Sequence, residues 1–397
     1  MLPSKTLKVL HIAPTPFFSD RGCHIRIRNE VEALEQAGVR VVVATYHHGN
    51  SPDDLDLRRI AKIPGYTRTS AGYSPYRFVA DGMLLQLVMR ILKHDQPDLM
   101  HAHLHEGALV GWMARKLLGR PGIPLIMDMQ GSLGGELAAY NAFGPFTLLL
   151  RGFQKIEQWV CRMPDFFFCS STASRDLLLA DFGVSPSCTR LVKDIIPGRF
   201  FSPPKTHGTG FPHPAPDDSP TVIYTGSLLE GKGLSLLLEA MARVLQDRPG
   251  VKFVLLGYPH AQAAQFLEKL GWTNRCDLPG QVPYDQLPQW LSRAHLAIEP
   301  KIGDSGEASG KLIHYMAAGL PVACFRTPNN WEILGANGYY AGEQTARALA
   351  RAILRVLDDP HAGRHGGQGR SRVARKFAPE VVADRMVDIY QRLLHLR

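Results

Sequence analysis

Short apolar runs alternate with helix-like segments along most of this chain, and this alternation restricts the fold more than any other feature. The first run, Leu7–Ala13, suits a buried strand, and Ile25–Gln36 behind it carries apolar residues at helical spacing. Val39–Thr45 is a second apolar run. Strands that alternate with helices predict right-handed βαβ units and a parallel sheet covered on both faces. Further strands are expected at Pro97–His103, Pro124–Met129, Phe166–Ser171 and Arg190–Lys193.

The alternation stops once and then begins again. Ser202–Pro220 is rich in proline, glycine and polar residues, which predicts an interdomain linker. Thr221–Thr225 restarts the pattern, and only helices are expected after Pro321–Phe325. We therefore predict an α/β protein with two doubly wound, Rossmann-like lobes facing across a cleft. The predicted parts are a first lobe at 1–201, a linker at 202–220, a second lobe at 221–378, and a C-terminal helix at 379–397 that packs back on the first lobe.

Length, charge and cysteine content limit the protein class. The 397 residues suit two domains, and no apolar stretch is long enough to span a bilayer. Since the first residues also lack a signal-peptide pattern, a cytoplasmic protein is expected, soluble or peripheral at the cytosolic membrane face. The six cysteines are scattered and predict no disulfide framework or zinc site. A net charge of +9 favours anionic partners, but no nucleic-acid motif is present, so nucleic acid is not expected.

Glycine-containing turns mark the candidate ligand sites, because open α/β sheets bind ligands beyond the carboxyl ends of their strands. The turn Pro14–Gly22 ends in Gly22, which permits a close approach of backbone to a ligand. In Tyr224–Gly233, Gly226 ends a strand and Lys232 stands where a helix begins. A lysine there opposes the helix dipole, which indicates an anion between the two.

The third turn gives the strongest phosphate signal. Gly303, Gly306 and Gly310 form a pliable loop, and Lys301 and Lys311 flank it where a helix starts. Helix N–H groups, a dipole and two ammonium groups then converge on one point. The spacing excludes a Walker A loop, and neither lobe has a G-x-G-x-x-G fingerprint after its first strand, which argues against a nicotinamide enzyme.

These motifs resemble a known family over nearly the whole chain. The segments that carry the resemblance are Arg21-Gly22, Gly38–Val41, Gly226–Gly233, Glu307–Gly310 and His314–Val322. They resemble the retaining, nucleotide-sugar-dependent GT-B glycosyltransferases of the family 4 type. The resemblance implies transfer of a hexose from a nucleotide-diphosphate sugar, with UDP or GDP as the nucleotide and no cofactor. It also implies a hydroxyl acceptor on a lipid, glycan or small molecule, bound by residues 1–201, and a donor bound by residues 221–378.

The resemblance also assigns roles, with some departures. Glu307 corresponds to a glutamate near the donor sugar hydroxyls, and His314 stands where a second glutamate usually holds the ribose. Ser227 replaces the usual phosphate-binding arginine, whose charge Lys301 can supply, and Gln130 replaces a histidine near the reacting centre. The expected catalytic residues are Lys232, Lys301, Glu307 and Gln130. The expected donor-binding residues are Gly22, Gly226, Ser227, Ser309, Gly310, Lys311 and His314.

The reaction needs stabilisation of negative charge on the leaving diphosphate, and fixed cations with helix N–H groups can supply it. No Asp-x-Asp motif occurs at a strand end, so no metal dependence is expected. Asp128 either orients the acceptor or caps a turn. His105 and Glu106 are expected at the acceptor.

Two segments leave alternatives open. The alternating His101, His103 and His105 form a metal site only if their strand continues to residue 105; a cleft-lining role is the preferred interpretation. Phe143–Trp159 combines apolar and basic residues, which suits either a core-packed helix or contact with an anionic membrane.

Two other function classes remain. Ser227, His314 and Gln130 depart from the family pattern, which suits a non-catalytic nucleotide-sugar-binding subunit. A sugar-nucleotide epimerase shares the fold.

Overall fold

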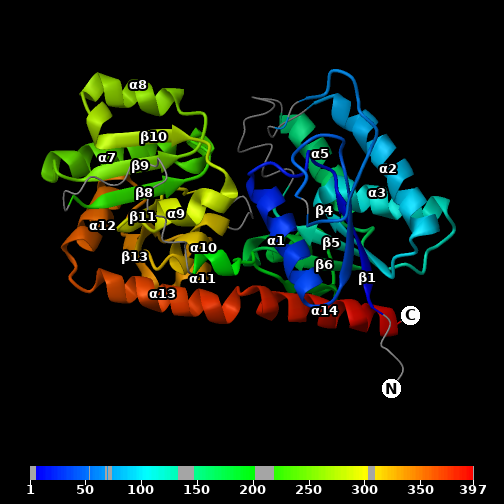
Figure 1. Cartoon of the computed structure of the whole chain (residues 1–397). Helices are drawn as coiled ribbons and strands as arrows, with labels where there is room; N and C mark the ends of the chain where they lie inside the picture. The colour runs from blue at the N-terminus through cyan, green and yellow to red at the C-terminus, as the bar shows by residue number, and fades with distance from the viewer. Residues whose placement is uncertain are drawn as a thin grey trace. The chain divides into compact units, whose positions relative to one another are not determined.

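The computed structural model describes residues 6–52, 54–67, 69, 74–132, 147–201, 219–302 and 309–396. They form two compact units (Figure 1), one from residues 1–195 and 379–397 and the other from 196–302 and 309–378. Most of the predicted linker lies outside the described residues. None of the helices in the described part of the chain is both long and apolar enough to cross a bilayer.

The first unit has a seven-stranded, wholly parallel sheet in the order β3-β2-β1-β4-β5-β6-β7. The strands are β1 (Lys8–Ala13), β2 (Arg40–Thr45), β3 (Leu57–Arg59), β4 (Leu99–His103), β5 (Leu125–Met129), β6 (Phe166–Cys169) and β7 (Thr189–Leu191). The predicted parallel sheet is confirmed. Only β3 was not predicted, because this short edge strand is half-exposed and has no apolar run.

Alternate residues of these strands face two different helix layers. Leu10, Met100 and Met127 point to a hydrophobic core shared with α2 (Tyr76–His94) and α3 (Leu104–Leu117). The other face carries His11, His101, His103 and Asp128 toward α1 (Gly22–Gln36) and α14 (Pro379–His395), which pack against each other. The remaining helices of this unit are α5 (Thr147–Val160) and α6 (Thr172–Ala180).

The second unit has a six-stranded parallel sheet in the order β10-β9-β8-β11-β12-β13. Its strands are β8 (Thr221–Thr225), β9 (Lys252–Leu256), β10 (Cys276–Gly280), β11 (Leu296–Glu299), β12 (Val322–Phe325) and β13 (Gly338–Ala341). Its helices are α7 (Leu234–Asp247), α8 (Ala261–Leu270), α9 (Leu287–Leu291), α10 (Gly310–Ala317), α11 (Pro328–Leu334), α12 (Ala346–Asp358) and α13 (Ala362–Lys376). The expectation of helices alone after β12 is wrong, because the half-buried edge strand β13 has no strong apolar pattern.

Strand order reverses at β1/β4 in the first unit and at β8/β11 in the second. Loops that leave neighbouring strands in opposite directions at such a point open a crevice at the carboxyl edge of the sheet. The three glycine-containing turns predicted as ligand sites follow β1, β8 and β11. The fold therefore places all three at switch points.

Candidate active site

A buried carboxylate organises the switch point of the second unit. Glu299 ends β11 with no exposed surface, and its Oε1 accepts the backbone N–H of Lys301 at 3.2 Å. The same oxygen lies 3.3 Å from Nζ of Lys311, and Oε2 accepts the hydroxyl of Ser309. Glu299 thus contacts both ends of the loop that is predicted to bind phosphate. Residues 303–308 of this loop, including Glu307, lie outside the described residues.

Lys311 is held against the end of the neighbouring strand. Its Nζ lies 4.5 Å from the ring centroid of Tyr224 and 3.4 Å from the phenol oxygen. Tyr224 donates to the carbonyl of Ser227 at 2.9 Å. A Cβ on Gly226 would approach Nζ of Lys311 to 3.3 Å, and Gly226 has a φ of +129°. Predicted donor-site residues from two separate turns therefore lie side by side.

Lys232 belongs to the same group. It ends the 3₁₀ turn Glu230–Lys232 and precedes Gly233, whose left-handed φ of +88° starts α7. A Cβ at Gly233 would lie 2.3 Å from the carbonyl oxygen of Pro300, so this turn packs closely against the residue that follows β11. Burial and Glu299 raise the pKa of Tyr224, and the charge of Lys232 opposes this shift. Lys232 and Glu299 thus act electrostatically on the same phenol.

The start of α10 also belongs to this group. Ser309 is its N-cap residue, but the hydroxyl donates to Glu299 and makes no cap hydrogen bond. Gly310 and Lys311 form the first turn. The positive end of the helix dipole therefore lies beside Lys311.

His314 has an internal role in this structure. Its Nδ1 lies 2.8 Å from the carbonyl oxygen of Gly310, and its Nε2 lies 2.9 Å from the hydroxyl of Tyr284. The ring also packs edge-on against Phe200. Contact with a donor ribose stays a prediction, and it would require one of these hydrogen bonds to be exchanged.

In the first unit, Gly22 begins α1 behind the turn that follows β1. Apart from its own chain neighbours and helix backbone, no described residue comes within 4 Å of a Cβ built on Gly22, so packing in the described part of the chain does not require glycine there. The turn is fixed instead by buried His24, whose Nδ1 accepts the backbone N–H of Ser19 at 3.0 Å and whose Nε2 contacts the hydroxyl of Thr15. Burial and the nearby charge of Arg21 lower the pKa of His24 to about 3, so the ring is neutral.

Asp128, near the end of β5, is fully buried and receives a bidentate pair of hydrogen bonds from Arg26 at 2.9 and 2.6 Å. Burial alone would raise the pKa of Asp128, but Arg26 and a hydrogen bond with His103 hold it well below its usual value. Gln130 donates to the same carboxylate at 2.8 Å. Asp128 is therefore placed to orient half-buried Gln130. Contact between Asp128 and an acceptor stays a prediction.

The predicted acceptor residues His105 and Glu106 point to different partners. β4 ends at His103, and Leu104, with a φ of +63°, starts α3, so His105 does not continue the strand. His105 Nε2 lies 3.2 Å from Glu157 of α5, whereas Glu106 pairs with Arg77 of α2 at 2.8 Å. The condition for a metal site at residues 101, 103 and 105 is not met.

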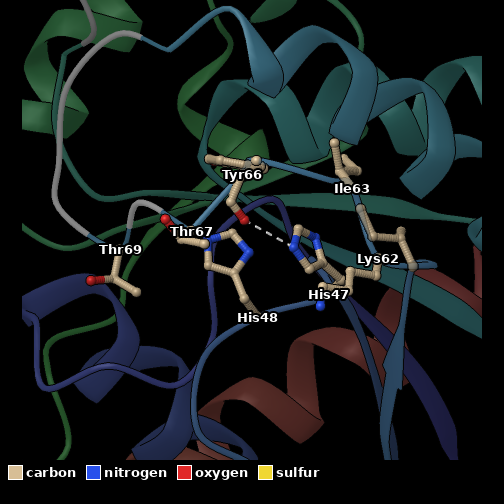
Figure 2. A pocket seen from close by; sticks show the side chains of 9 residues that line it. His47, His48, Lys62, Ile63, Tyr66, Thr67 and Thr69 are labelled. Carbon is tan, nitrogen blue, oxygen red and sulfur yellow. Dashed lines mark hydrogen bonds between the residues drawn. The ribbon is translucent and has the colours of Figure 1, made fainter.

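A pocket of about 400 Å³ lies beside the end of β2 (Figure 2), and sequence reasoning missed it. Its polar lining includes His47, His48, Lys62, Tyr66 and Thr67. His47 Nε2 lies 3.0 Å from the backbone oxygen of Tyr66. Burial and His48, together with smaller effects from the charges of Lys62 and Arg59, lower the pKa of His47. The only sequence signal was the paired histidine after an apolar run.

Known proteins match this chain over both units. The family models "Glycosyl transferase 4-like domain" and "Glycosyl transferases group 1" match residues 21–193 and 219–359. D-inositol 3-phosphate glycosyltransferase of Streptosporangium roseum is 22% identical over 395 residues, which cover 93% of this chain and 88% of that protein. 2-Deoxystreptamine glucosyltransferase of Streptomyces kanamyceticus is 23% identical over 66% of this chain and 69% of its own length.

Solved structures share the fold. Sucrose-phosphate synthase (tll1590) from Thermosynechococcus elongatus superposes with a TM-score of 0.77 at 20% identity, covering 98% of this chain and 100% of that one. Anabaena Alr3699/HepE in complex with UDP and glucose gives a TM-score of 0.74 at 15% identity, with coverage of 97% and 100%. The two family models and the two-lobed parallel α/β architecture show that the chain belongs to the GT-B glycosyltransferases of the family 4 type.

Proposed function

We propose that this protein transfers a hexose, with retention of anomeric configuration and without a metal ion, from a nucleotide-diphosphate sugar to a hydroxyl acceptor. The observation that carries the proposal is the grouping of Lys311, Ser309, Gly226 and Lys232 around Glu299 at the β8/β11 switch point. Anabaena Alr3699/HepE, which shares the fold, has been solved with UDP and with UDP-glucose. UDP is therefore the first nucleotide to test, and GDP the second.

The chemistry that this group can perform is electrostatic. Breaking the bond between the anomeric carbon and the diphosphate leaves negative charge on the phosphate. In the proposal, Lys232 and Lys301 neutralise that charge, and the backbone N–H groups at Ser309 and Gly310 donate to it. The leaving phosphate accepts the proton of the acceptor hydroxyl, so no separate general base is needed. Glu307 is assigned to the donor sugar hydroxyls on the family resemblance.

Glu299 acts in this proposal as a positioning residue. Its carboxylate holds Lys311 and Ser309 at the base of the loop, so that α10 begins at a fixed point. In the first unit, Asp128 has a similar role toward Gln130, which is assigned to the reacting centre. Both carboxylates are fully buried and therefore act through the side chains that they hold.

The acceptor is proposed to be a small molecule or a glycan that carries an anionic group. Lys62 gives the pocket at the end of β2 a cationic group, and His47 and His48 give it polar ring nitrogens. One curated relative is named for an inositol phosphate, which fits such a lining. A lipid acceptor, with peripheral contact to an anionic membrane, is the alternative that α5 favours. Its Ile156 and Trp159 side chains are exposed.

The direct test incubates the full chain with UDP-glucose or GDP-mannose without an acceptor and follows nucleotide release. Slow donor hydrolysis by the wild type that is lost in Lys232→Ala supports the transferase. Nucleotide binding in a thermal-shift assay, with no turnover on any acceptor, would instead support a non-catalytic binding subunit. Conversion of the donor sugar to its epimer would support an epimerase.

A further inference from the structure

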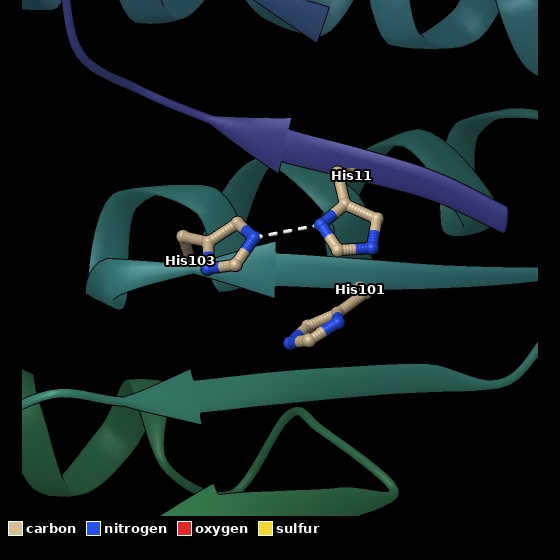
Figure 3. Close-up of side chains that lie close together, drawn as sticks. All are labelled: His11, His101 and His103. Atoms are coloured by element: carbon tan, nitrogen blue, oxygen red, sulfur yellow. Dashed lines mark hydrogen bonds between the residues drawn. The ribbon is translucent and has the colours of Figure 1, made fainter. Parts of the chain in front are cut away.

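Three histidines from two neighbouring strands lie together in the core of the first unit (Figure 3). His11 on β1 is the register partner of His101 on β4, and His103 follows two residues later on the same face of β4. None of the three side chains has exposed surface. One ring nitrogen from each lies within 4.8 Å of the others.

The outer nitrogens of this cluster are oriented by other side chains. His103 Nδ1 lies 3.3 Å from Oδ2 of Asp128, and His101 Nδ1 lies 2.7 Å from the hydroxyl of Tyr390 on α14. A carboxylate and a hydroxyl on the outer nitrogens leave Nε2 of both rings to face inward. Metal-binding histidines characteristically have this kind of partner, because it fixes the tautomer and the ring orientation.

Some of the ring nitrogens in the cluster form hydrogen bonds, and others do not. His11 Nδ1 lies 2.9 Å from His103 Nε2, a contact in which one proton is shared between two potential ligand atoms. Since Asp128 takes the proton of His103 Nδ1, His103 Nε2 is the acceptor and His11 Nδ1 the donor. Among the described residues, no hydrogen bond reaches Nε2 of His11 or Nε2 of His101. Such unsatisfied buried nitrogens are rare in native proteins and call for a partner.

The surroundings favour a cation. A single guanidinium, Arg26, lies within 3.0 Å of carboxylate oxygens of Glu30, Asp128 and Asp194. Neither oxygen of Glu30 takes part in a hydrogen bond within the described chain. A carboxyl oxygen of Glu30, a ring nitrogen of His103 and a carboxylate oxygen of Asp128 also lie within 4.8 Å of one another. Burial raises the pKa of Glu30, and a cation beside the three imidazoles would favour its ionised form.

We propose that His11, His101 and His103 bind one divalent transition-metal ion, with Zn²⁺ as the ion that fits their chemistry, as a structural site inside the first unit. Two nitrogens on one tetrahedral zinc ion lie about 3.4 Å apart, so the cluster needs only a small contraction. Binding breaks the His11–His103 hydrogen bond, because His103 Nε2 becomes a ligand, and it occupies the unsatisfied Nε2 of His101. Glu30, whose carboxyl oxygen lies within 4.8 Å of a ring nitrogen of His103, is assigned as the fourth ligand.

Two further properties fit this site. Burial and the neighbouring histidines lower the pKa of His11 and His101, and burial lowers that of His103, so all three rings are neutral ligands near pH 7. Because the rings are fully buried, the ion is enclosed during folding and does not meet substrate. The site is therefore separate from the metal-independent chemistry proposed for the second unit.

Metal content of the full-length protein tests the proposal directly. The wild type, produced with added Zn²⁺ and washed with a chelator, is expected to retain one zinc ion per chain. His101→Gln should lose it. The double variant His47→Gln, His48→Gln removes a half-buried histidine pair outside the cluster, whose ring centroids are 4.4 Å apart, and it should keep the ion. Loss of metal from the control with retention in His101→Gln would overturn the proposal.

A second experiment uses the wild-type protein, so its result does not depend on whether a variant of a metal-binding histidine folds. Wild-type protein is unfolded, stripped of metal and refolded with or without Co²⁺. Visible absorption of tetrahedral cobalt and a raised Tm are expected with the ion. Tyr390→Phe keeps the bulk of the ring but removes the hydroxyl on His101, and should weaken Zn²⁺ binding about tenfold in chelator competition. Wild type that holds no stoichiometric metal, and refolds to the same Tm without it, would show that the cluster is a hydrogen-bonded core only.

Discussion

Glu299 and Lys311 form an ion pair at 3.3 Å in which the carboxylate is completely buried and the lysine side chain is 18% exposed. Lys311 was expected to flank a phosphate as a cation. Its charge is instead directed toward Glu299 and the face of Tyr224. The pair thus fixes the start of α10, and in the proposed mechanism Lys232 and Lys301 supply more of the positive charge for the phosphate.

Replacing Glu299 should therefore reduce stability as well as donor use. Glu299→Ala leaves Lys311 largely buried without its carboxylate, and we expect a loss of about 3 kcal/mol in the free energy of unfolding. Urea denaturation monitored by circular dichroism measures this. Glu268→Ala on α8 is the control, because Glu268 is exposed and its removal should change stability by less than about 0.5 kcal/mol. Equal effects of the two substitutions would contradict the positioning role of Glu299.

Lys232→Ala should lower turnover far more than stability. Loss of one fixed charge at the leaving phosphate is expected to reduce kcat about a hundredfold, or roughly 3 kcal/mol of transition-state stabilisation. The Tm should stay close to that of the wild type, because the lysine is half-buried at the end of a 3₁₀ turn. Steady-state kinetics with a saturating donor measures the effect, and Lys269→Ala, an exposed lysine on α8, serves as the control. A Lys232→Ala enzyme with wild-type kcat would remove Lys232 from the mechanism.

Periodicity predicted the sheets well, because buried parallel strands are continuous apolar runs that few other structures produce. It failed at the edge strands β3 and β13, which are only half-buried and carry little apolar pattern. The grouping of Gly226, Lys232 and Lys311 was predictable from the turns at which they stand.

Contacts made by buried polar side chains were not predictable in this way. Glu299 is a charged residue at the end of an apolar strand, and this was the only available signal for it. His11 stands in the first strand, but its partnership with His101 depends on β1 and β4 being neighbours in register. Spacing along the chain pointed to His105 instead, which the left-handed Leu104 turns onto α3.

Substitutions at two glycines of the proposed donor site should distinguish an effect on protein stability from an effect on ligand binding. Gly233→Ala places a Cβ 2.3 Å from the carbonyl oxygen of Pro300 at a φ of +88°, and should cost more than about 1 kcal/mol. The Cβ of Gly22→Ala meets no other described residue within 4 Å, so stability should be unchanged or slightly raised. If Gly22 allows close approach of the donor, its alanine variant should nevertheless show a raised KM for donor. A Gly22→Ala enzyme with wild-type kinetics would show that no ligand passes that close.

Lys62 tests the proposed anionic acceptor. Lys62→Met keeps a long side chain in the pocket beside β2 but removes the charge. We expect a raised KM for a phosphorylated acceptor such as inositol phosphate, and no change for its unphosphorylated form or for donor hydrolysis. Lys93→Met, an exposed lysine near the end of α2, is the control. Equal effects on the phosphorylated and unphosphorylated acceptors would mean that the pocket does not recognise the phosphate group.

The pair of His105 and Glu157 should make stability fall as pH rises above neutrality. Burial alone would lower the pKa of His105, but its contacts with Cys161 and Glu157 raise it from 6.5 to about 10. A raised folded-state pKa contributes stability that is complete below about pH 6.5 and is lost as the pH rises through about 10. Between these values the slope for this group approaches about 1.4 kcal/mol per pH unit. Urea titrations of the wild type at successive pH values in this range measure it.

His105→Gln removes the titrating group, so the variant should be less stable than the wild type near pH 7 and should lose less stability on going to pH 9. Glu157→Gln should show the same flattening, because it removes the carboxylate that favours the protonated ring. His361→Gln, an exposed histidine of the second unit, is the control and should leave the wild-type slope in place. If His105→Gln keeps the full alkaline slope, the imidazole is neutral in the folded protein, and its 3.2 Å contact with Glu157 has no ionic component.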